Sequence, residues 1–147
     1  MPHARETIRS AVVTAVTGLT TTSTRVYESR YLPLGPSLSP SLCVYTRLDT
    51  PDYSAGVMQD RPRRVLEVHV EGYCDGADQS VLDDMASEVE AAIFNNTALQ
   101  GLVGSVSLGE QAMRVEGEGA ELVSVIDMVF NITYSTAEGS PGTVLRG

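Results

Sequence analysis

The first pattern along the chain is a stripe of apolar residues at helical spacing. It runs from Ile8 to Leu19 and predicts a helix over residues 5–17 with one buried face. Gly18 and the polar residues after it end the pattern, and glycine commonly follows the last turn of a helix. The members of the stripe are Ile8, Val12, Ala15, Val16 and Leu19.

A second stripe with the same period predicts a helix over residues 79–94. Asp78 stands just before it, and its carboxylate can accept hydrogen bonds from the free backbone N–H groups of the first turn. Residues 98–103 predict one further short turn of helix. The members of this second stripe are Leu82, Met85, Val89, Ala92 and Ile93.

Strict alternation marks the clearest strand. From Val65 to Tyr73, aliphatic residues alternate with Glu67, His69 and Glu71. One face of this strand is therefore predicted to be buried and the other to face solvent, as in an antiparallel sheet covered on one side. Weaker patterns predict the remaining strands, at residues 25–27, 41–46, 105–115 and 121–134.

The order of elements is helix, three strands, helix, two strands. It predicts an α+β fold in which a mostly antiparallel sheet of about four to five strands packs against the N-terminal helix and the second helix. A chain of 147 residues suits one domain, which we place at residues 1–135. Gly109 lies inside a predicted strand and indicates a bulge.

Two segments fall outside this pattern. Residues 48–64 are polar and broken by prolines and a glycine, so we predict a long mobile loop, and loops of that length are usually functional or disordered. Residues 136–147 have little apolar content, and we expect a flexible C-terminal tail. The chain contains no apolar run of about 18 residues, so we expect no membrane span. Residues 1–6 lead into the first helix rather than a long apolar run, so we expect no secretory signal.

Charge is unevenly distributed. The formal net charge is −9, and every basic residue other than histidine is an arginine. Residues 1–64 hold eight arginines and five acids, whereas residues 65–147 hold two arginines and fourteen acids. A sequence pI of about 4.5 argues against specific nucleic-acid binding. Opposed charge halves favour association between copies of the same chain.

The search for catalytic chemistry finds no convergent set. Cys43 and Cys74 lie far apart and have no metal-ligand spacing, so we expect reduced thiols. His69 and Glu71 share a strand face, but a zinc site needs three or four ligands, and the preferred interpretation is the solvent face of a half-buried strand. Asp83 and the adjacent Asp84 point about 100° apart on a helix, which favours a solvated face over a carboxylate pair. No cofactor, no metal and no enzyme activity are predicted.

The order and local character of the segments resemble a known family. The amphipathic first helix is followed by Arg25-Val26-Tyr27-Glu28-Ser29-Arg30, a proline-rich stretch and Leu42-Cys43-Val44-Tyr45-Thr46. Leu66-Glu67-Val68-His69-Val70-Glu71-Gly72 precedes the acidic helix, and the last strand closes on Phe130-Asn131-Ile132-Thr133-Tyr134. This pattern resembles the tail terminator proteins of long-tailed phages, the lambda-like minor tail protein U family, over residues 5–135.

The resemblance implies a structural role in the virion. Such proteins form a hexameric ring that caps the tail tube at its final length, stops tube polymerisation and offers a surface for head–tail joining. The implied partners are other copies of the chain, the tail tube protein and the head–tail connector protein. The implied location is the head-proximal end of the virion tail, reached from the host cytoplasm during assembly.

Two hypotheses attach residues to that role. The first is charge pairing between subunits, since a ring needs two different complementary faces. The second is docking on the tube by the end of the predicted loop, through Asp60, Arg61, Arg63 and Arg64, with ordering of the loop on binding. The inter-subunit charge pairs would draw on Arg25, Arg30, Arg47, Asp83, Asp84, Glu88 and Glu90.

Other interpretations remain open at this point. Each charge can instead be solvated, because exposed pairs contribute only about 0–1 kcal/mol. The loop can be a tolerated surface insertion. The protein can also be another ring component of the head–tail neck, a small cytosolic enzyme that uses His69, or a ligand-binding module. A ligand-binding module predicts a monomer with a pocket.

Overall fold

The computed structural model describes residues 3–28, 40–52, 63–117, 122–137 and 139–145. Helices and strands follow the predicted order, including the short helix predicted at residues 98–103, with one more strand at the C-terminal end. The elements are α1 (Ala4–Val16), β1 (Val26–Tyr27), β2 (Ser41–Asp52), β3 (Arg63–Asp75), α2 (Gln79–Phe94), α3 (Thr97–Leu102), β4 (Ser105–Glu116), β5 (Val123–Ala137) and β6 (Ser140–Leu145).

The strands form one sheet in the order β1-β2-β3-β5-β4, and β6 pairs with β5. Neighbours along β2, β3, β5 and β4 are all antiparallel, and only β1 runs parallel to its neighbour β2. The predicted α+β fold with a mostly antiparallel sheet is confirmed. The predicted bulge at Gly109 is also present, because the register between β4 and β5 shifts between Leu108 and Gln111.

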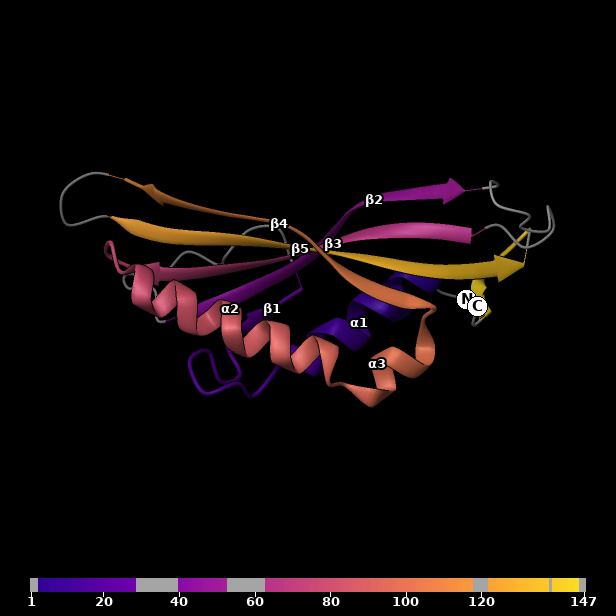
Figure 1. The fold of residues 1–147 in the computed structure, drawn as a ribbon, viewed down its shortest axis with the longest axis horizontal. Coiled ribbons are helices and arrows are strands. Elements are labelled where there is room, and N and C mark those ends of the chain that lie inside the picture. Colours follow the sequence, from indigo (N-terminus) through magenta and orange to yellow (C-terminus); the bar gives the residue numbers. More distant parts are fainter. Residues whose placement is uncertain (1–2, 29–39, 53–62, 118–121, 138, 146–147) are drawn as a thin grey trace.

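The molecule has two layers (Figure 1). The helices α1, α2 and α3 lie on one side of the sheet, which we call the helix face. The opposite side, which we call the open face, carries no helix in the described part of the chain. Gly72 illustrates the assignment, because a methyl group added there would touch Met85 of α2 as well as Ile126 of β5.

The core lies between the helices and the helix face. Alternate residues of β3 and β5 point into it, and the apolar stripes of α1 and α2 meet them, as predicted from the two periodicities. Burying these side chains removes apolar surface from water and supplies the main stabilisation of the fold. The fully buried members include Ile8, Val12, Val16, Leu66, Val68, Val70, Leu82, Val89, Ile93, Met128, Phe130, Ile132 and Tyr134.

Side chains and glycines define the helix ends. Asp78 accepts hydrogen bonds from the backbone N–H groups of Ser80 and Val81, which confirms it as the N-cap of α2. His3 is the N-cap of α1, and its Nδ1 accepts a hydrogen bond from the backbone N–H of Arg5 at 3.2 Å. Gly18 follows α1 with φ at +90°, a conformation that favours glycine.

The loop predicted over residues 48–64 is shorter at both ends than the sequence pattern suggested. Residues 48–52 belong to β2 and residues 63–64 to β3, and the two strands pair as far as Asp52 and Arg63. Hydropathy missed these ends because a strand can extend on backbone hydrogen bonds where its side chains are polar. Residues 53–62 lie outside the described residues.

The described part of the segment predicted as a flexible tail, residues 136–147, lies mostly in strands. β5 continues through Ala137. The chain reverses direction at Gly139, and β6 then pairs with Ser135–Ala137 of β5. Gly139 has φ at +78°, as a tight turn requires. Val144 packs against the core. This contact and the backbone pairing with the end of β5 position β6, although the segment has a low overall hydropathy.

Candidate functional site

The centre of the open face carries a connected group of polar side chains. We call Tyr45, Glu67, His69, Glu71, Tyr73 and Asp127 the polar cluster. These residues come from three adjacent strands, β2, β3 and β5, and the register brings them together. Cross-strand neighbours on one face of a sheet interact directly, so the cluster links the three strands.

His69 lies between two carboxylates. Its Nδ1 is 2.8 Å from Asp127 Oδ1, and its Nε2 is 2.8 Å from Glu67 Oε1. Ionised carboxylates only accept hydrogen bonds, so both ring nitrogens must carry protons to satisfy both contacts. Burial alone would lower the pKa of His69, but the hydrogen bonds and charges of Asp127 and Glu67 outweigh it and raise that pKa. The arrangement therefore favours the protonated form of His69.

Glu71 lies beside this group and is 7% exposed. Its carboxylate accepts from the hydroxyl of Tyr45 at 2.5 Å and from the hydroxyl of Tyr73. Burial first, and then the bond to Glu71, raise the pKa of Tyr73, so this phenol stays protonated and remains a donor. Two hydroxyl donors thus compensate the burial of a negative charge.

The predicted solvent face of β3 is therefore wrong in one respect. His69 and Glu71 do lie on the face away from the helices, but they are only 6% and 7% exposed. Their neighbours shield them, because Tyr45 stacks on His69 and Tyr73 bonds to Glu71. A polar residue on a sheet face can be buried by adjacent side chains alone, and strand alternation cannot predict this.

This geometry does not suit catalysis. A general base needs a free lone pair within reach of a substrate, and both nitrogens of His69 already bond to carboxylates. Burial first, and then the charge of Glu71, raise the pKa of Cys43 to about 12, so this thiol is a poor nucleophile at neutral pH. Among the described residues, no three His, Cys, Asp or Glu side chains gather as a metal site would require.

The open face also contains a hollow of about 450 Å³ beside the polar cluster. Leu48 and Thr50 of β2, Val65 and Glu67 of β3, and Asn131 of β5 contribute to its lining. No helix in the described part of the chain is long and apolar enough to cross a membrane.

Two of the residues proposed for inter-subunit pairing are used within the subunit. The guanidinium of Arg25 donates to the carbonyls of Pro40, at 2.8 Å, and Thr21, at 3.1 Å. Glu88 accepts from the backbone N–H of Thr21 at 2.8 Å. Both therefore fix the segment after α1. Local sequence pattern could not predict this, because Glu88 binds Thr21 from 67 residues away and Arg25 binds backbone carbonyls, which any residue supplies.

The other residues of that hypothesis differ in exposure. Arg47 is exposed on β2 and is 3.4 Å from Glu67 of the polar cluster. Asp83 and Asp84 are exposed on α2. Glu90 accepts from Gln111 of β4 at 2.6 Å. Arg30 lies outside the described residues.

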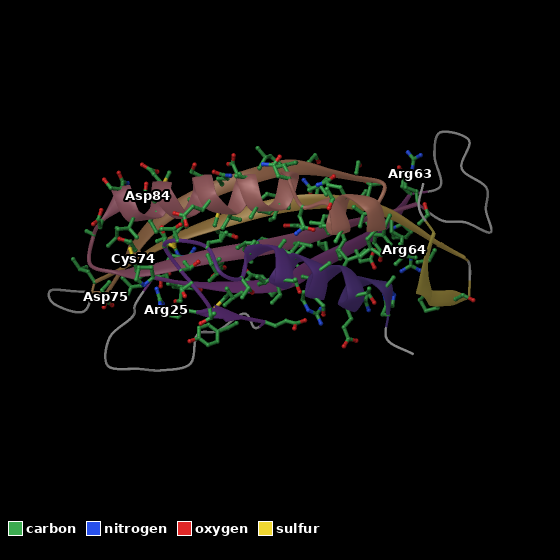
Figure 2. The ribbon with its side chains drawn as sticks, turned by 90° about the horizontal axis from the view of Figure 1, so that it is seen from below. Arg25, Arg63, Arg64, Cys74, Asp75 and Asp84 are labelled. Carbon is green, nitrogen blue, oxygen red and sulfur yellow. The ribbon has the colours of Figure 1, made fainter. Side chains whose placement is uncertain are left out.

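Of the four residues proposed for docking on the tube, two are described by the structure and two are not. Asp60 and Arg61 lie outside the described residues, and Arg63 and Arg64 begin β3. Arg64 forms an ion pair with the buried carboxylate of Asp49 at 3.3 Å, so it serves the fold. Figure 2 places Arg63 and Arg64 at one end of the sheet and Arg25 at the other, so these three arginines do not form a single patch.

Comparisons with known proteins show a distant likeness among solved structures. No family model matches the chain, and no curated protein matches it. Among solved structures, the chain is similar to a chain of the virion of a native gene transfer agent particle. The two chains are 21% identical, with a TM-score of 0.43, and the match covers 91% of this chain and 92% of that chain. A likeness at this distance does not define a function.

Proposed function

We propose that this protein is a structural virion protein that acts as a tail terminator. Copies of it form a ring on the end of the tail tube, stop tube polymerisation and offer a surface for head–tail joining. The resemblance in segment order suggests this role. The described elements contain that order, α1, β1, β2, β3, α2, β4, β5, with α3 between α2 and β4 and β6 after β5. The protein acts at the head-proximal end of the tail after assembly in the host cytoplasm.

The observation that carries the proposal is how the chain uses its polar side chains. His69, Glu71 and their tyrosine partners hold neighbouring strands together instead of facing an open cleft. What the described residues leave available is surface: exposed acids on α2, an exposed arginine on β2 and half-exposed apolar side chains on β4. Such surfaces suit contacts with other proteins.

Electron microscopy of the purified protein tests the proposal. The protein is imaged alone and after mixing with headless tail tubes, and tube length is measured during tube growth. We expect rings on one end of each tube and an arrest of growth once they bind. A component of the head side of the neck would leave the tube ends bare, and that result would reject the terminator role.

A variant separates this role from enzyme chemistry. His69→Ala removes the one described histidine that lies near other titratable groups on the open face. We expect it to lower stability but to retain capping of tubes at a temperature where it stays folded. Loss of capping by a folded His69→Ala protein would favour a chemical role for the imidazole. His3→Ala serves as the control for loss of a histidine elsewhere.

A further inference from the structure

Large apolar side chains remain exposed along β4. Leu108, Met113 and Val115, which we call the β4 row, are each about half exposed. Phe94, close to the core at the end of α2, is 38% exposed and contacts Phe130. Covering such side chains with another chain removes apolar surface from water and is favourable.

The strand register places the β4 row on one face of the sheet. Leu108 lies opposite Phe130 and Met113 lies opposite Ile126, and both partners are buried in the core under the helices. Directly opposed residues of neighbouring strands share a face. Val115 is two residues beyond Met113 and therefore points the same way. The whole row lies on the helix face, at the outer margin of the sheet.

The backbone of β4 is available on the same margin. β4 pairs with β5 on one side, and no described strand lies on its outer side. The bulge between Leu108 and Gln111 interrupts the strand, so residues 111–116 form its longest regular stretch. An outer strand with half-exposed apolar side chains is an aggregation risk unless another strand covers it.

We infer that residues 111–116 of β4 pair with the same residues of a second copy, across a two-fold axis perpendicular to the sheet. The inference goes beyond the proposed function, because it concerns the free protein and requires neither a ring nor a tube. A two-fold contact uses the same surface on both copies. It also sets the two strands antiparallel, which is the more stable arrangement.

The position of the β4 row selects this axis. With the axis perpendicular to the sheet, the helix faces of both copies lie on the same side. Met113 and Val115 of one copy then approach Met113 and Val115 of the other, and both are covered. A second copy turned over would place the two rows on opposite faces of the joined sheet, where neither could cover the other.

The charges of this stretch also suit contact between two copies. The chain has a net charge of −9, but residues 111–116 carry one arginine and one glutamate and are neutral overall. The side chains of Arg114 and Glu116 are 44% and 57% exposed and bond to each other at 2.5 Å. Two copies can therefore meet at this stretch without net repulsion between its own charges.

Association of the free protein is the first test, measured by sedimentation equilibrium over a range of concentrations. We expect the wild type to dimerise and Met113→Lys to weaken the dimer at least about tenfold, because two ammonium groups then approach each other in an apolar contact. Met113→Leu should retain the dimer. Leu48→Lys is the matched control, since Leu48 is 49% exposed like Met113 but lies on β2. Thermal unfolding checks that each variant folds.

Cross-linking is the second test. Ala112→Cys places one thiol on the exposed side of β4, and a flexible bismaleimide joins thiols that approach closely. We expect covalent dimers. Ser10→Cys, on the exposed side of α1, is the control and should give none. Wild-type protein reports the background from the buried Cys43 and Cys74.

The outcomes separate this inference from the terminator role. A wild type that stays monomeric, or a dimer that Met113→Lys leaves intact, would overturn the pairing of β4. So would equal losses in Met113→Lys and Leu48→Lys, or a larger assembly without cross-linking through Ala112→Cys. Capping of tubes is scored separately. A wild-type dimer joined through β4 that never binds tubes would support the pairing and reject the terminator role.

Discussion

The imidazole of His69 lies nearly flat against the ring of Tyr45. Their ring centroids are 4.9 Å apart and the planes are inclined by 10°. The two residues are direct partners in the β2–β3 register. The stack covers one side of an imidazolium whose two nitrogens bond to Asp127 and Glu67, and an aromatic face attracts a cation.

The pH dependence of stability tests this arrangement. The pKa of His69 is raised in the folded protein, so its contribution to the free energy of unfolding is present below its unfolded value of 6.5 and is lost as pH rises through the raised value. We expect the free energy of unfolding of the wild type to exceed that of His69→Gln by more at about pH 6 than at about pH 9. Urea unfolding at both pH values measures the difference.

His3 provides a control with the opposite sign. Burial, followed by the charges of Arg5 and Arg64, lowers the pKa of His3. Its contribution is therefore lost as pH falls, so the difference between wild type and His3→Gln should shrink toward acid pH. A difference between wild type and His69→Gln that does not change with pH would contradict the imidazolium assignment.

Removal of the Tyr73 hydroxyl tests the compensation of Glu71. Tyr73→Phe leaves a buried carboxylate with one hydroxyl donor fewer, and we expect a loss of about 1–3 kcal/mol in the free energy of unfolding. Tyr27→Phe is the matched control, since Tyr27 is exposed and its change should have little effect. Chemical denaturation measures both, and equal effects would show that Glu71 does not need the Tyr73 hydroxyl.

Gly72 tests the packing between β3 and α2. A methyl group there would lie 3.0 Å from Ile126 Cγ2 and 3.0 Å from Met85 Sδ. We expect Gly72→Ala to lower the free energy of unfolding by about 1–3 kcal/mol through overpacking. Gly101→Ala meets no atom within 4 Å and lies in α3, so it should leave stability unchanged or raise it. Thermal unfolding compares the two, and a neutral Gly72→Ala would mean that the layers can separate at little cost.

Thiol labelling tests the state of Cys43. Burial first, and then the charge of Glu71, raise the pKa of its thiol to about 12, so almost none is thiolate at neutral pH. We expect iodoacetamide to leave Cys43 unmodified in the folded protein and to label it in urea, as read by mass spectrometry of peptides. Labelling at equal rates in both conditions would show that β2 opens readily at this position.

Much of the fold could be predicted from local pattern. The 3.6-residue stripe ending at Ile93 and the two-residue alternation around Val68 determine which face of each element is buried, because burial of alternate residues depends only on the element itself. Asp78 as N-cap follows equally from the sequence, since its partners Ser80 and Val81 are neighbours.

The ends of strands could not be predicted in this way. β2 continues to Asp52 and β6 forms at Ser140–Leu145 because another strand offers backbone hydrogen bonds there. The partner strands are close in sequence, but the polar side chains at these strand ends give no period to detect. The strand within the predicted flexible tail was missed for the same reason.

The candidate site shows the same division. The sequence by itself determined that His69 and Glu71 share a strand face, that charge is divided unequally along the chain, and that the helices bury one apolar stripe each. Only the tertiary structure decided that Asp127, 58 residues away, bonds to His69 and that Arg25 and Glu88 are used inside the subunit. The physical reason is that side-chain bonding depends on strand register and on packing of the turn after α1, and both are fixed by contacts between distant segments.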